Sequence, residues 1–172
     1  MKIAIIGYSG SGKSTLASYL SKTYNIPALY LDTVHFLPGW VEKDDERARE
    51  EVKKFMDQND GWVIDGNYRA YEQERKLEEA DQIIFMDFGR FDCLYRAIKR
   101  YKENKNTSRE SMTQGCEEKL DKEFILWILK DGRDKKHKKR YDDIVQKYKD
   151  KTVILHNQKE LDQFKKNLSE ER

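Results

Sequence analysis

The stretch GYSGSGKST, residues 7–15, has the residue types and the spacing of a phosphate-binding loop. Gly7 and Gly12, followed by Lys13 and Ser14, satisfy the pattern G-x-x-x-x-G-K-[ST]. Glycines adopt backbone angles closed to other residues, so successive N–H groups can converge on phosphate oxygens at the start of a helix. Lysine then reaches the β- and γ-phosphates, and the serine hydroxyl binds Mg²⁺. The pattern predicts that ATP and Mg²⁺ are bound by Gly7, Ser9, Gly10, Ser11, Gly12, Lys13, Ser14 and Thr15.

The residues on either side of this loop decide against a glycine-rich surface turn that matches by chance. Residues 3–6 are all apolar, as in a buried parallel strand. Leu16, Leu20 and Tyr24 follow at spacings of four, as on one face of a helix. Strand, loop and helix therefore occur in the order that a phosphate loop requires.

Three aspartates follow apolar runs that predict further strands. Asp32, Asp65 and Asp87 come directly after residues 28–31, 62–64 and 82–86. Because the carboxyl ends of parallel strands share one edge of a sheet, we expect all three beside the phosphate loop. One of them should hold Mg²⁺, directly or through water. Hydrophobicity favours the strand before Asp87, Asp65 is the rival, and spacing leaves the choice open.

Arginines are the candidates for stabilising charge on a transferred phosphoryl group. Arg96 and Arg100 lie four residues apart, hence on one face of a predicted helix. Arg109 lies in a polar stretch at about 102–118 that is too long for an ordinary connection and is a candidate mobile lid. Arg133 and Arg140, further along the chain, are weaker candidates.

The rest of the apolar pattern predicts the elements that must position these residues. Strands are expected at 2–6, 28–31, 62–65, 82–87 and 152–155, with helices between them and after the last one. This alternation predicts an α/β fold: a three-layer sandwich with a five-stranded parallel sheet covered on both faces. We expect one domain, with its crevice at the carboxyl ends of the strands. Phe91 is expected on the buried stripe of its helix, and Phe124, Trp127 and Tyr141 in the core rather than stacked on a base.

Composition sets outer limits on the class of protein. Charged residues make up 38% of the 172 residues and apolar residues 37%, but the apolar residues fall into periodic segments, which predicts a folded protein with a charged surface. Cys93 and Cys116 are expected to be reduced thiols, and the first apolar run is too short for a signal peptide or a membrane span. We therefore expect a cytoplasmic location and no membrane partner.

Charge is unevenly distributed along the chain. The formal net charge of +2 is too small to predict a general polyanion binder. Residues 1–86 hold 11 Lys and Arg against 15 Asp and Glu, a net of −4, whereas residues 87–172 hold 23 against 17, a net of +6. Anions are expected to meet the second half of the chain.

Three segments resemble the core of the adenylate kinase group of P-loop kinases: the loop at 7–15, VIDGNYR at 63–69 and DFGRFDCLYRAIKR at 87–100. In that group the third strand ends in Asp-Gly with an arginine close behind, matched by Asp65, Gly66 and Arg69. A later strand leads into a helix with two arginines four apart, matched by Arg96 and Arg100. The resemblance implies a nucleoside-monophosphate-kinase-like sheet with a helical or lid insertion.

Nearly the whole chain is also similar to a narrower bacterial branch commonly labelled "DNA topology modulation protein". The shared segments are LDTVHFLPGW, GWVIDGNYR, CLYRAIKR, TQGCEEKLDKEFILWI and KHKKR. That label describes a phenotype and not a reaction. At the lid the group often has Arg-Pro-Asp-Met where this chain has Arg-Glu-Ser-Met, residues 109–112, which changes the middle of the motif.

The resemblance assigns roles to the aspartates. Asp65 becomes the favoured Mg²⁺ partner, through water, and Asp87 a strand-end or helix-capping residue. In shikimate-kinase-like relatives an acid at the position of Asp32 faces the phosphoryl acceptor; the alternative is a satisfied turn residue. The acceptor segment is placed at about 33–60, and the acceptor contacts at Asp32, His35, Trp40, Asp65 and Arg69. The transfer step is assigned to Lys13, Asp32, Arg96, Arg100 and Arg109, and Asn157 and Gln158 are placed near adenine.

Two functions of different classes follow. The first is an ATP-dependent phosphotransferase acting on a small acceptor, for which a nucleoside monophosphate, a nucleoside and a sugar acid are all compatible. The second is a regulatory, DNA-topology-modulating protein in which ATP acts as a switch, suggested by the label and by the basic run at 135–140. Against direct DNA binding stand four aspartates around that run, at 131, 134, 142 and 143, and the absence of a DNA-binding signature. His137 and His156 lack the partners of a metal site.

Overall fold

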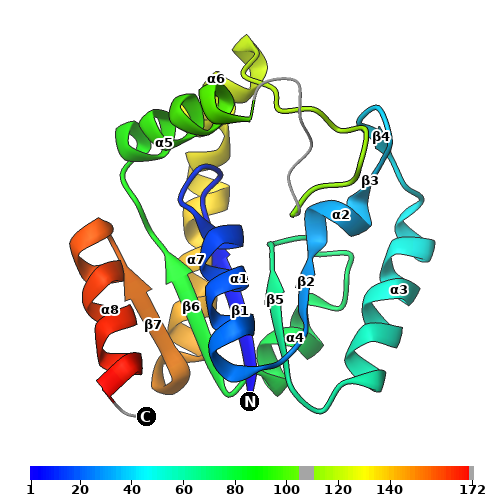
Figure 1. Ribbon diagram of the computed structural model, residues 1–172, viewed down its shortest axis with the longest axis vertical. Helices are drawn as coiled ribbons and strands as arrows, with labels where there is room; N and C mark the ends of the chain where they lie inside the picture. Colours follow the sequence, from blue (N-terminus) through cyan, green and yellow to red (C-terminus); the bar gives the residue numbers. More distant parts are fainter. Residues whose placement is uncertain (105–110, 171–172) are drawn as a thin grey trace.

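The central element of the structure is a parallel five-stranded sheet with the strand order β2-β5-β1-β6-β7. The structure is a computed structural model and describes residues 1–104 and 111–170. The strands are β1 (Lys2–Gly7), β2 (Ala28–Tyr30), β5 (Trp62–Asp65), β6 (Gln82–Met86) and β7 (Thr152–Leu155). They run in the same direction, so their carboxyl ends meet at one edge (Figure 1). The predicted sheet is confirmed.

Helices surround this sheet, as the sequence predicts. They are α1 (Lys13–Tyr24), α3 (Asp45–Gln58), α4 (Gln73–Glu79), α5 (Arg90–Glu103), α6 (Lys122–Leu129), α7 (Lys135–Lys147) and α8 (Gln158–Glu170). In Figure 1, α5 and α6 lie across the carboxyl ends of the strands, and α8 lies beside β7 at one edge of the sheet. Three of the helices begin after aspartates, Asp44, Asp121 and Asp134, whose side chains accept hydrogen bonds from backbone N–H groups three residues on.

The core is built on β1, whose residues 3–6 are inaccessible to solvent. Leu16 and Leu20 of α1 are equally buried, in agreement with the predicted stripe. Phe91 and Trp127 were expected in the core, and that prediction is wrong, because their side chains are 74% and 42% exposed. The reason is that α5 and α6 sit above the sheet edge, so α5 is fastened through smaller residues, Cys93 and Ala97.

The chain departs from the predicted strands after β2. That strand ends at Tyr30, and Asp32 lies in the first turn of a short helix, α2 (Leu31–His35). An antiparallel hairpin follows, formed by β3 (Phe36–Leu37) and β4 (Val41–Glu42). Strands of two residues carry no periodic signal, which is why the sequence did not predict them. Helix α5 runs to Glu103, so the first residues of the expected lid are helical.

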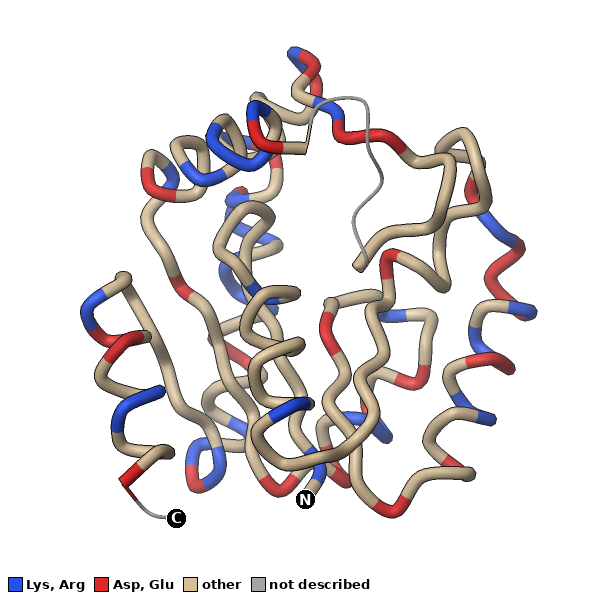
Figure 2. Tube along the Cα trace, in the orientation of Figure 1, with Lys and Arg blue, Asp and Glu red and all other residues tan. Residues whose placement is uncertain are grey.

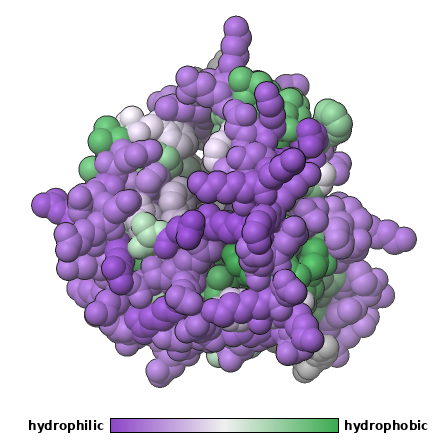
Figure 3. Space-filling model, turned by 180° about the vertical axis from the view of Figure 1, so that it is seen from behind, coloured by the Kyte–Doolittle hydropathy of each residue, from purple (hydrophilic) through white to green (hydrophobic). Residues whose placement is uncertain are grey.

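The surface carries the charge that the composition predicts. Lys and Arg residues follow one another along α5 and α7 (Figure 2). Seen from behind, the molecule is largely hydrophilic, with apolar side chains in separate patches (Figure 3). Within the described residues no helix is long and apolar enough to cross a membrane. Cys93 and Cys116 are both buried free thiols.

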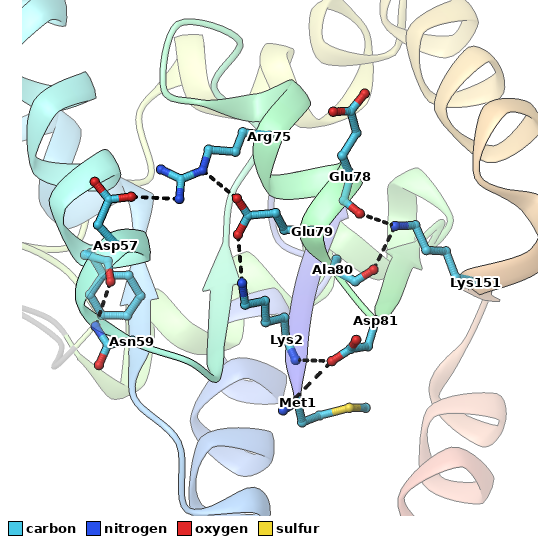
Figure 4. A network of polar contacts seen from close by, with 11 residues as sticks. Met1, Lys2, Asp57, Asn59, Arg75, Glu78, Glu79, Ala80, Asp81 and Lys151 are labelled. Carbon is cyan, nitrogen blue, oxygen red and sulfur yellow. Dashed lines mark hydrogen bonds and ion pairs between the residues drawn. The ribbon is translucent and has the colours of Figure 1, made fainter.

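A polar network closes the amino end of the sheet, opposite the phosphate loop (Figure 4). Glu79 at the end of α4 accepts hydrogen bonds from Lys2 of β1 (2.8 Å) and from Arg75 (2.6 Å). Arg75 also pairs with Asp57 of α3 at 2.7 Å. These bonds lower the pKa of Glu79 and attach α4 to the sheet at the end remote from the site.

We predict that Ile5→Ala lowers the free energy of unfolding by about 2–5 kcal/mol, because it opens a cavity in the central strand. The matched control is Phe91→Ala, which removes a largely exposed side chain and should change stability by roughly 0.5 kcal/mol or less. Urea unfolding of both variants provides the measurement. Equal losses in the two variants would contradict this assignment of the core.

Candidate active site

The phosphate loop joins β1 to α1, and two of its glycines have backbones that other residues rarely adopt. Gly7 has φ +143° and packs so closely on β6 that a Cβ atom would lie 2.5 Å from the carbonyl oxygen of Met86. Gly12 has φ +97° and precedes the first residue of α1. Lys13 Nζ donates to the carbonyl oxygen of Tyr8 at 3.0 Å, within the loop itself. The lysine amine therefore lies against the concave backbone that would receive phosphate.

Ser14 and Asp65 meet at the base of this loop. The Ser14 hydroxyl donates to Asp65 Oδ2 at 2.6 Å, and Asp65 is only 4% exposed. Its other oxygen, Oδ1, is buried and has no hydrogen-bond partner among the described residues. Burial raises the pKa of Asp65, while the charge of Lys13 and the hydrogen bond from Ser14 act in the opposite direction. A buried carboxylate with one unused oxygen is suited to accept from a bound water or to bind a cation.

The donor set at this point fits Mg²⁺. A hydroxyl and a carboxylate are the oxygen ligands that Mg²⁺ prefers, and it usually takes its remaining ligands from phosphate and water. No group of three or more His, Cys, Asp or Glu side chains in residues 1–104 and 111–170 could hold a metal alone. The residues present therefore fit a magnesium ion that arrives with a nucleotide.

Asp87, the rival of Asp65, lies elsewhere. Its side chain is 38% exposed, and its nearest charged partner is His156, at 3.9 Å. Burial raises the pKa of Asp87, and the charge of His156 opposes this. The structure thus pairs the Ser14 hydroxyl with Asp65, and not with Asp87.

Helices α5, α6 and α8 contribute side chains over the loop. Arg96 donates to the carbonyl oxygen of Ser11 at 3.2 Å and to the side chain of Gln158. Trp127 Nε1 donates to Ser9 Oγ at 3.1 Å, a contact that the sequence did not indicate because an indole on an apolar stripe is usually core. Gln158, placed near adenine by resemblance, is thereby connected to the phosphate side through Arg96.

Arg100, the other arginine of α5 that the sequence predicts for the site, has a carboxylate partner. Arg100 Nε donates to Glu118 Oε2 at 2.9 Å, and Glu118 is buried. Sequence reasoning missed Glu118, since one acid in a polar stretch carries no periodic signal. Arg109, the predicted lid arginine, lies outside the described residues.

The two weaker candidates, Arg133 and Arg140, lie on different sides of the site. The Arg133 guanidinium lies 3.7 Å from the ring centre of Tyr8 and donates to the carbonyl oxygen of Phe88 at 2.7 Å. Arg140 donates instead to the carbonyl oxygen of Asn67 at 2.9 Å, so it faces the loop after β5. Of the two, Arg140 is the one that reaches the side predicted to hold the acceptor.

On the acceptor side, Asp32 accepts a hydrogen bond at Oδ1 from the Tyr68 hydroxyl at 2.7 Å. Burial, followed by the negative charge of Asp32, raises the pKa of Tyr68, which keeps the hydroxyl protonated as a donor. The sequence gave no sign of this pair, because the two residues are far apart in the chain and meet only through the pairing of β2 with β5. Asp32 is thus a hydrogen-bonded carboxylate that lines the cleft.

His35 is held by a second tyrosine. Its Nδ1 lies 2.6 Å from the hydroxyl of Tyr71, which donates its own proton to Asp45 at 3.0 Å. Because a hydroxyl has one proton, Nδ1 of His35 must carry the hydrogen of their shared bond. His35 Nε2 points to Glu42 at 3.6 Å. These contacts fix the ring, in agreement with a packing or substrate-edge role.

The described end of the expected lid packs on the β3–β4 hairpin. Trp40 Nε1 donates to the carbonyl oxygen of Glu117 at 3.1 Å, and Thr113 Oγ1 donates to that of Phe36 at 2.6 Å. Gly39 N donates to the Gly115 carbonyl at 3.0 Å. Residues 113–117 are therefore hydrogen-bonded to the first part of the acceptor segment, residues 36–40.

One open cleft, with a volume of about 2100 Å³, connects these groups. Its lining includes most predicted residues from both halves of the site: Gly7, Ser9, Gly10, Gly12, Lys13, Ser14, Thr15, Asp32, His35, Trp40, Asp65, Arg69, Arg96, Arg100, Asn157 and Gln158. Among the predicted residues that do not line the cleft are Ser11, which is fully buried within the loop, and Asp87. Segments far apart in the sequence thus meet at the edge where the parallel strands end.

Solved structures with a similar architecture include a deoxyadenosine kinase. A deoxyadenosine kinase from M. mycoides with bound dATP has 17% sequence identity and a TM-score of 0.56, over 98% of this chain and 100% of that one. The same enzyme with the products dCMP and a flexible dCDP has 15% sequence identity and a TM-score of 0.54, over 99% of this chain and 100% of that one. An uncharacterized protein from Eubacterium ventriosum has 18% identity and a TM-score of 0.50, over 91% of this chain and 89% of that one. No family model and no curated protein matches the sequence.

These likenesses, at low identity, establish the P-loop kinase fold. They do not extend to the narrower bacterial branch or to its label, and membership of that branch stays a prediction from the sequence.

We predict that Ser14→Ala weakens the apparent affinity for Mg²⁺ in the presence of ATP by roughly 10-fold or more, because it removes one oxygen ligand and the donor to Asp65. Titration of a fluorescent ATP analogue at varied Mg²⁺ measures this. In EDTA the affinity for the analogue should equal that of the unaltered protein, which provides the internal control. A uniform loss with and without Mg²⁺ would assign Ser14 to the loop's shape instead.

Proposed function

We propose that this protein is a Mg·ATP-dependent phosphotransferase, a kinase that transfers the γ-phosphoryl group to a hydroxyl of a small acceptor. The observation that carries the proposal is the single cleft in which a full phosphate loop faces a second set of acidic and basic side chains. A protein that only bound ATP as a switch would need the first set alone. The two halves together supply a donor site and an acceptor site.

On the donor side, Lys13 would reach the β- and γ-phosphates, and Ser14 and Asp65 would hold Mg²⁺, Asp65 through water. When bound, the metal ion neutralises negative charge on the phosphate oxygens. Arg96, Arg100 and, by resemblance, Arg109 would place positive charge beside the phosphoryl oxygens, which carry negative charge during the transfer. In the reaction the bond from the γ-phosphorus to the bridging oxygen of ADP breaks, and a bond to the acceptor oxygen forms.

On the acceptor side, Asp32 would accept the proton of the attacking hydroxyl. The hydrogen bond from Tyr68 engages Oδ1 and turns the carboxylate, which leaves Oδ2 for the acceptor. His35 and Trp40 would contact the body of the acceptor at the rim of the cleft.

Arg69 and Arg140 favour an acceptor that also carries negative charge. They are near enough for the charge of Arg69 to lower the pKa of Arg140, in addition to the larger effect of burial. The groups to which Arg140 donates, the carbonyl of Asn67 and the amide of Gln73, are neutral. A phosphate or carboxylate on the acceptor would balance this charge, so nucleoside monophosphates and sugar acids are the first compounds to test, with nucleosides beside them.

Direct DNA binding is not proposed as the primary activity. Asp134 caps α7, and Asp143 pairs with Lys139 at 2.8 Å, so part of the basic run is neutralised within the helix itself. A nucleotide-regulated switch remains the alternative if no acceptor is phosphorylated.

We predict that ADP release with Mg·ATP rises when a suitable acceptor is added, and that Lys13→Ala abolishes this rise while leaving the fold intact. The reason is that Lys13 supplies charge at the transferred group rather than packing. A coupled ADP assay over nucleotides, nucleosides, sugars and hydroxy acids gives the rates, and circular dichroism checks the fold.

If no acceptor in that screen raises ADP release above the rate with water, the phosphotransferase proposal fails. An unchanged rate in Lys13→Ala would remove Lys13 from the mechanism.

We predict that Tyr68→Phe lowers kcat roughly 10-fold, because it removes a hydrogen bond to the charged oxygen that orients Asp32. KM for ATP should stay within about twofold of its original value, since the donor half is untouched. Steady-state kinetics with the acceptor from the screen measures both constants. Tyr24→Phe, on the partly buried end of α1, is the matched control, and an equal effect in both variants would contradict the role given to Tyr68.

A further inference from the structure

Strand β5 ends at Asp65, and the chain then turns away from the sheet towards Arg69. Gly66 N makes the last contact with the sheet, donating to the carbonyl oxygen of Ile5 at 3.1 Å. Gly66 has φ +127°, and a Cβ atom there would lie 2.8 Å from Cβ of Leu31. The carbonyl groups of Gly66 and Asn67 lie beyond the end of the strand and need other partners, because Gly66 is buried and Asn67 is half-buried.

The Gly66 carbonyl is satisfied by a buried lysine. Lys76 of α4 is fully inaccessible to solvent, and its Nζ donates to Gly66 O at 2.6 Å. Burial lowers the pKa of Lys76 to about 7, although the nearby charge of Asp65 opposes the shift. Lysine is among the residues least often buried, since removing an amine from water is unfavourable.

The next residue of the turn is held from the same side. Arg140 of α7 donates to the carbonyl oxygen of Asn67 at 2.9 Å, and Gln73 of α4 donates to Asn67 Oδ1 at 2.8 Å. Arg140 also donates to Gln73, which closes the set. Two successive residues after β5 thus have their polar groups held by side chains from α4 and α7.

The turn held in this way connects both halves of the cleft. Asp65, which accepts from Ser14, immediately precedes it, and Tyr68, which donates to Asp32, follows two residues after Gly66. A rotation about the backbone at Gly66 would change the position of the Tyr68–Arg69 segment relative to the Asp65 carboxylate. The bond to Lys76 is the contact that opposes such a rotation at its start.

We propose that Lys76 is a positioning residue that acts through the Gly66 carbonyl to fix the segment 65–69, and so sets the alignment of donor and acceptor. The catalytic part of this inference rests on the proposed phosphotransferase function. Attachment of α4 does not require this lysine, because the helix is fastened at its other end by the network of Lys2, Glu79 and Arg75 (Figure 4). An apolar side chain of similar length would fill the same volume without the unfavourable desolvation.

The test compares Lys76→Met with Arg75→Met. Both substitutions replace a basic residue of α4 by methionine, but the side chain of Arg75 pairs with Glu79 and Asp57 rather than with the turn after β5. For Lys76→Met we expect kcat/KM for the acceptor to fall about 10- to 100-fold, the magnitude typical of a lost second-layer contact. The Kd for the ATP analogue should stay within about twofold, and Arg75→Met should leave both constants unchanged.

Hydrogen–deuterium exchange by mass spectrometry gives a readout independent of catalysis. Exchange in peptides covering 66–71 should become about 10-fold faster in Lys76→Met, while exchange in 7–15 stays the same. If the unaltered protein phosphorylates no acceptor, the proposed function fails, yet this exchange experiment still decides whether Lys76 positions the turn.

Two results would overturn the proposal: unchanged acceptor kinetics and exchange in Lys76→Met, or an equal loss of acceptor kinetics and ATP affinity, which indicates a general structural role. Should Lys76→Met not fold, Gln73→Met decides the matter. It removes the bonds to Asn67 and Arg140, and the proposal then requires the same selective loss on the acceptor side.

Discussion

The hydrogen bond between Ser14 and Asp65 is the contact on which the rest of the site depends. It ties the first turn of α1 to the end of β5, the strand that separates β1 from β2. The contact is made away from water, where burial raises the pKa of Asp65. Basic groups stand on either side, Lys13 in the phosphate loop and Lys76 behind the turn, and their charges oppose that shift. The Asp65 carboxylate can bind a cation or a water only if the neighbouring basic groups keep it ionised and Ser14 keeps it oriented.

The parallel direction of the strands in the main sheet makes this arrangement possible. Since the strands are parallel, the phosphate loop after β1, the acidic turn after β5 and the helix after β2 all leave from one edge. Pairing of β2 with β5 then places Tyr30 beside Asp65, and this register brings Asp32 within reach of Tyr68. Helices α5 and α6 cover the same edge, so their arginines and Trp127 meet the loop from above. The groups proposed to bind the donor and the acceptor are therefore neighbours because of the topology of the sheet, although they are far apart in the sequence.

The sequence was sufficient for those parts of the structure that repeat with a fixed period. The loop at 7–15 follows from its motif and the strands of the main sheet from apolar periodicity, whereas the acceptor-side residues of the cleft were placed by the resemblance. What it could not supply were pairs made by tertiary contact, such as Tyr68 with Asp32, Tyr71 with His35 and Glu118 with Arg100. Phe91 and Trp127 misled the prediction for a related reason. Helices α5 and α6 lie above the edge of the sheet, so their apolar stripes do not pack on a face of the sheet and part of each stripe stays exposed.

The buried polar side chains of the described residues are concentrated at the candidate site and not in the core beneath it. Apart from aromatic residues, five polar or charged residues are buried in the described parts of the chain: Ser11, Asp65, Gln73, Lys76 and Glu118. Each lies in the phosphate loop, beside it, behind the turn after β5 or against Arg100. Burying such groups is unfavourable unless each finds partners, and an apolar core would be more stable. Ion pairs elsewhere, such as those of Lys2 with Glu79 and Lys139 with Asp143, keep part of their side chains exposed, so the buried polar side chains other than aromatic ones gather at the candidate site. Packing does not require these five residues there, whereas the proposed phosphoryl transfer would require the groups around the transferred phosphate to be aligned.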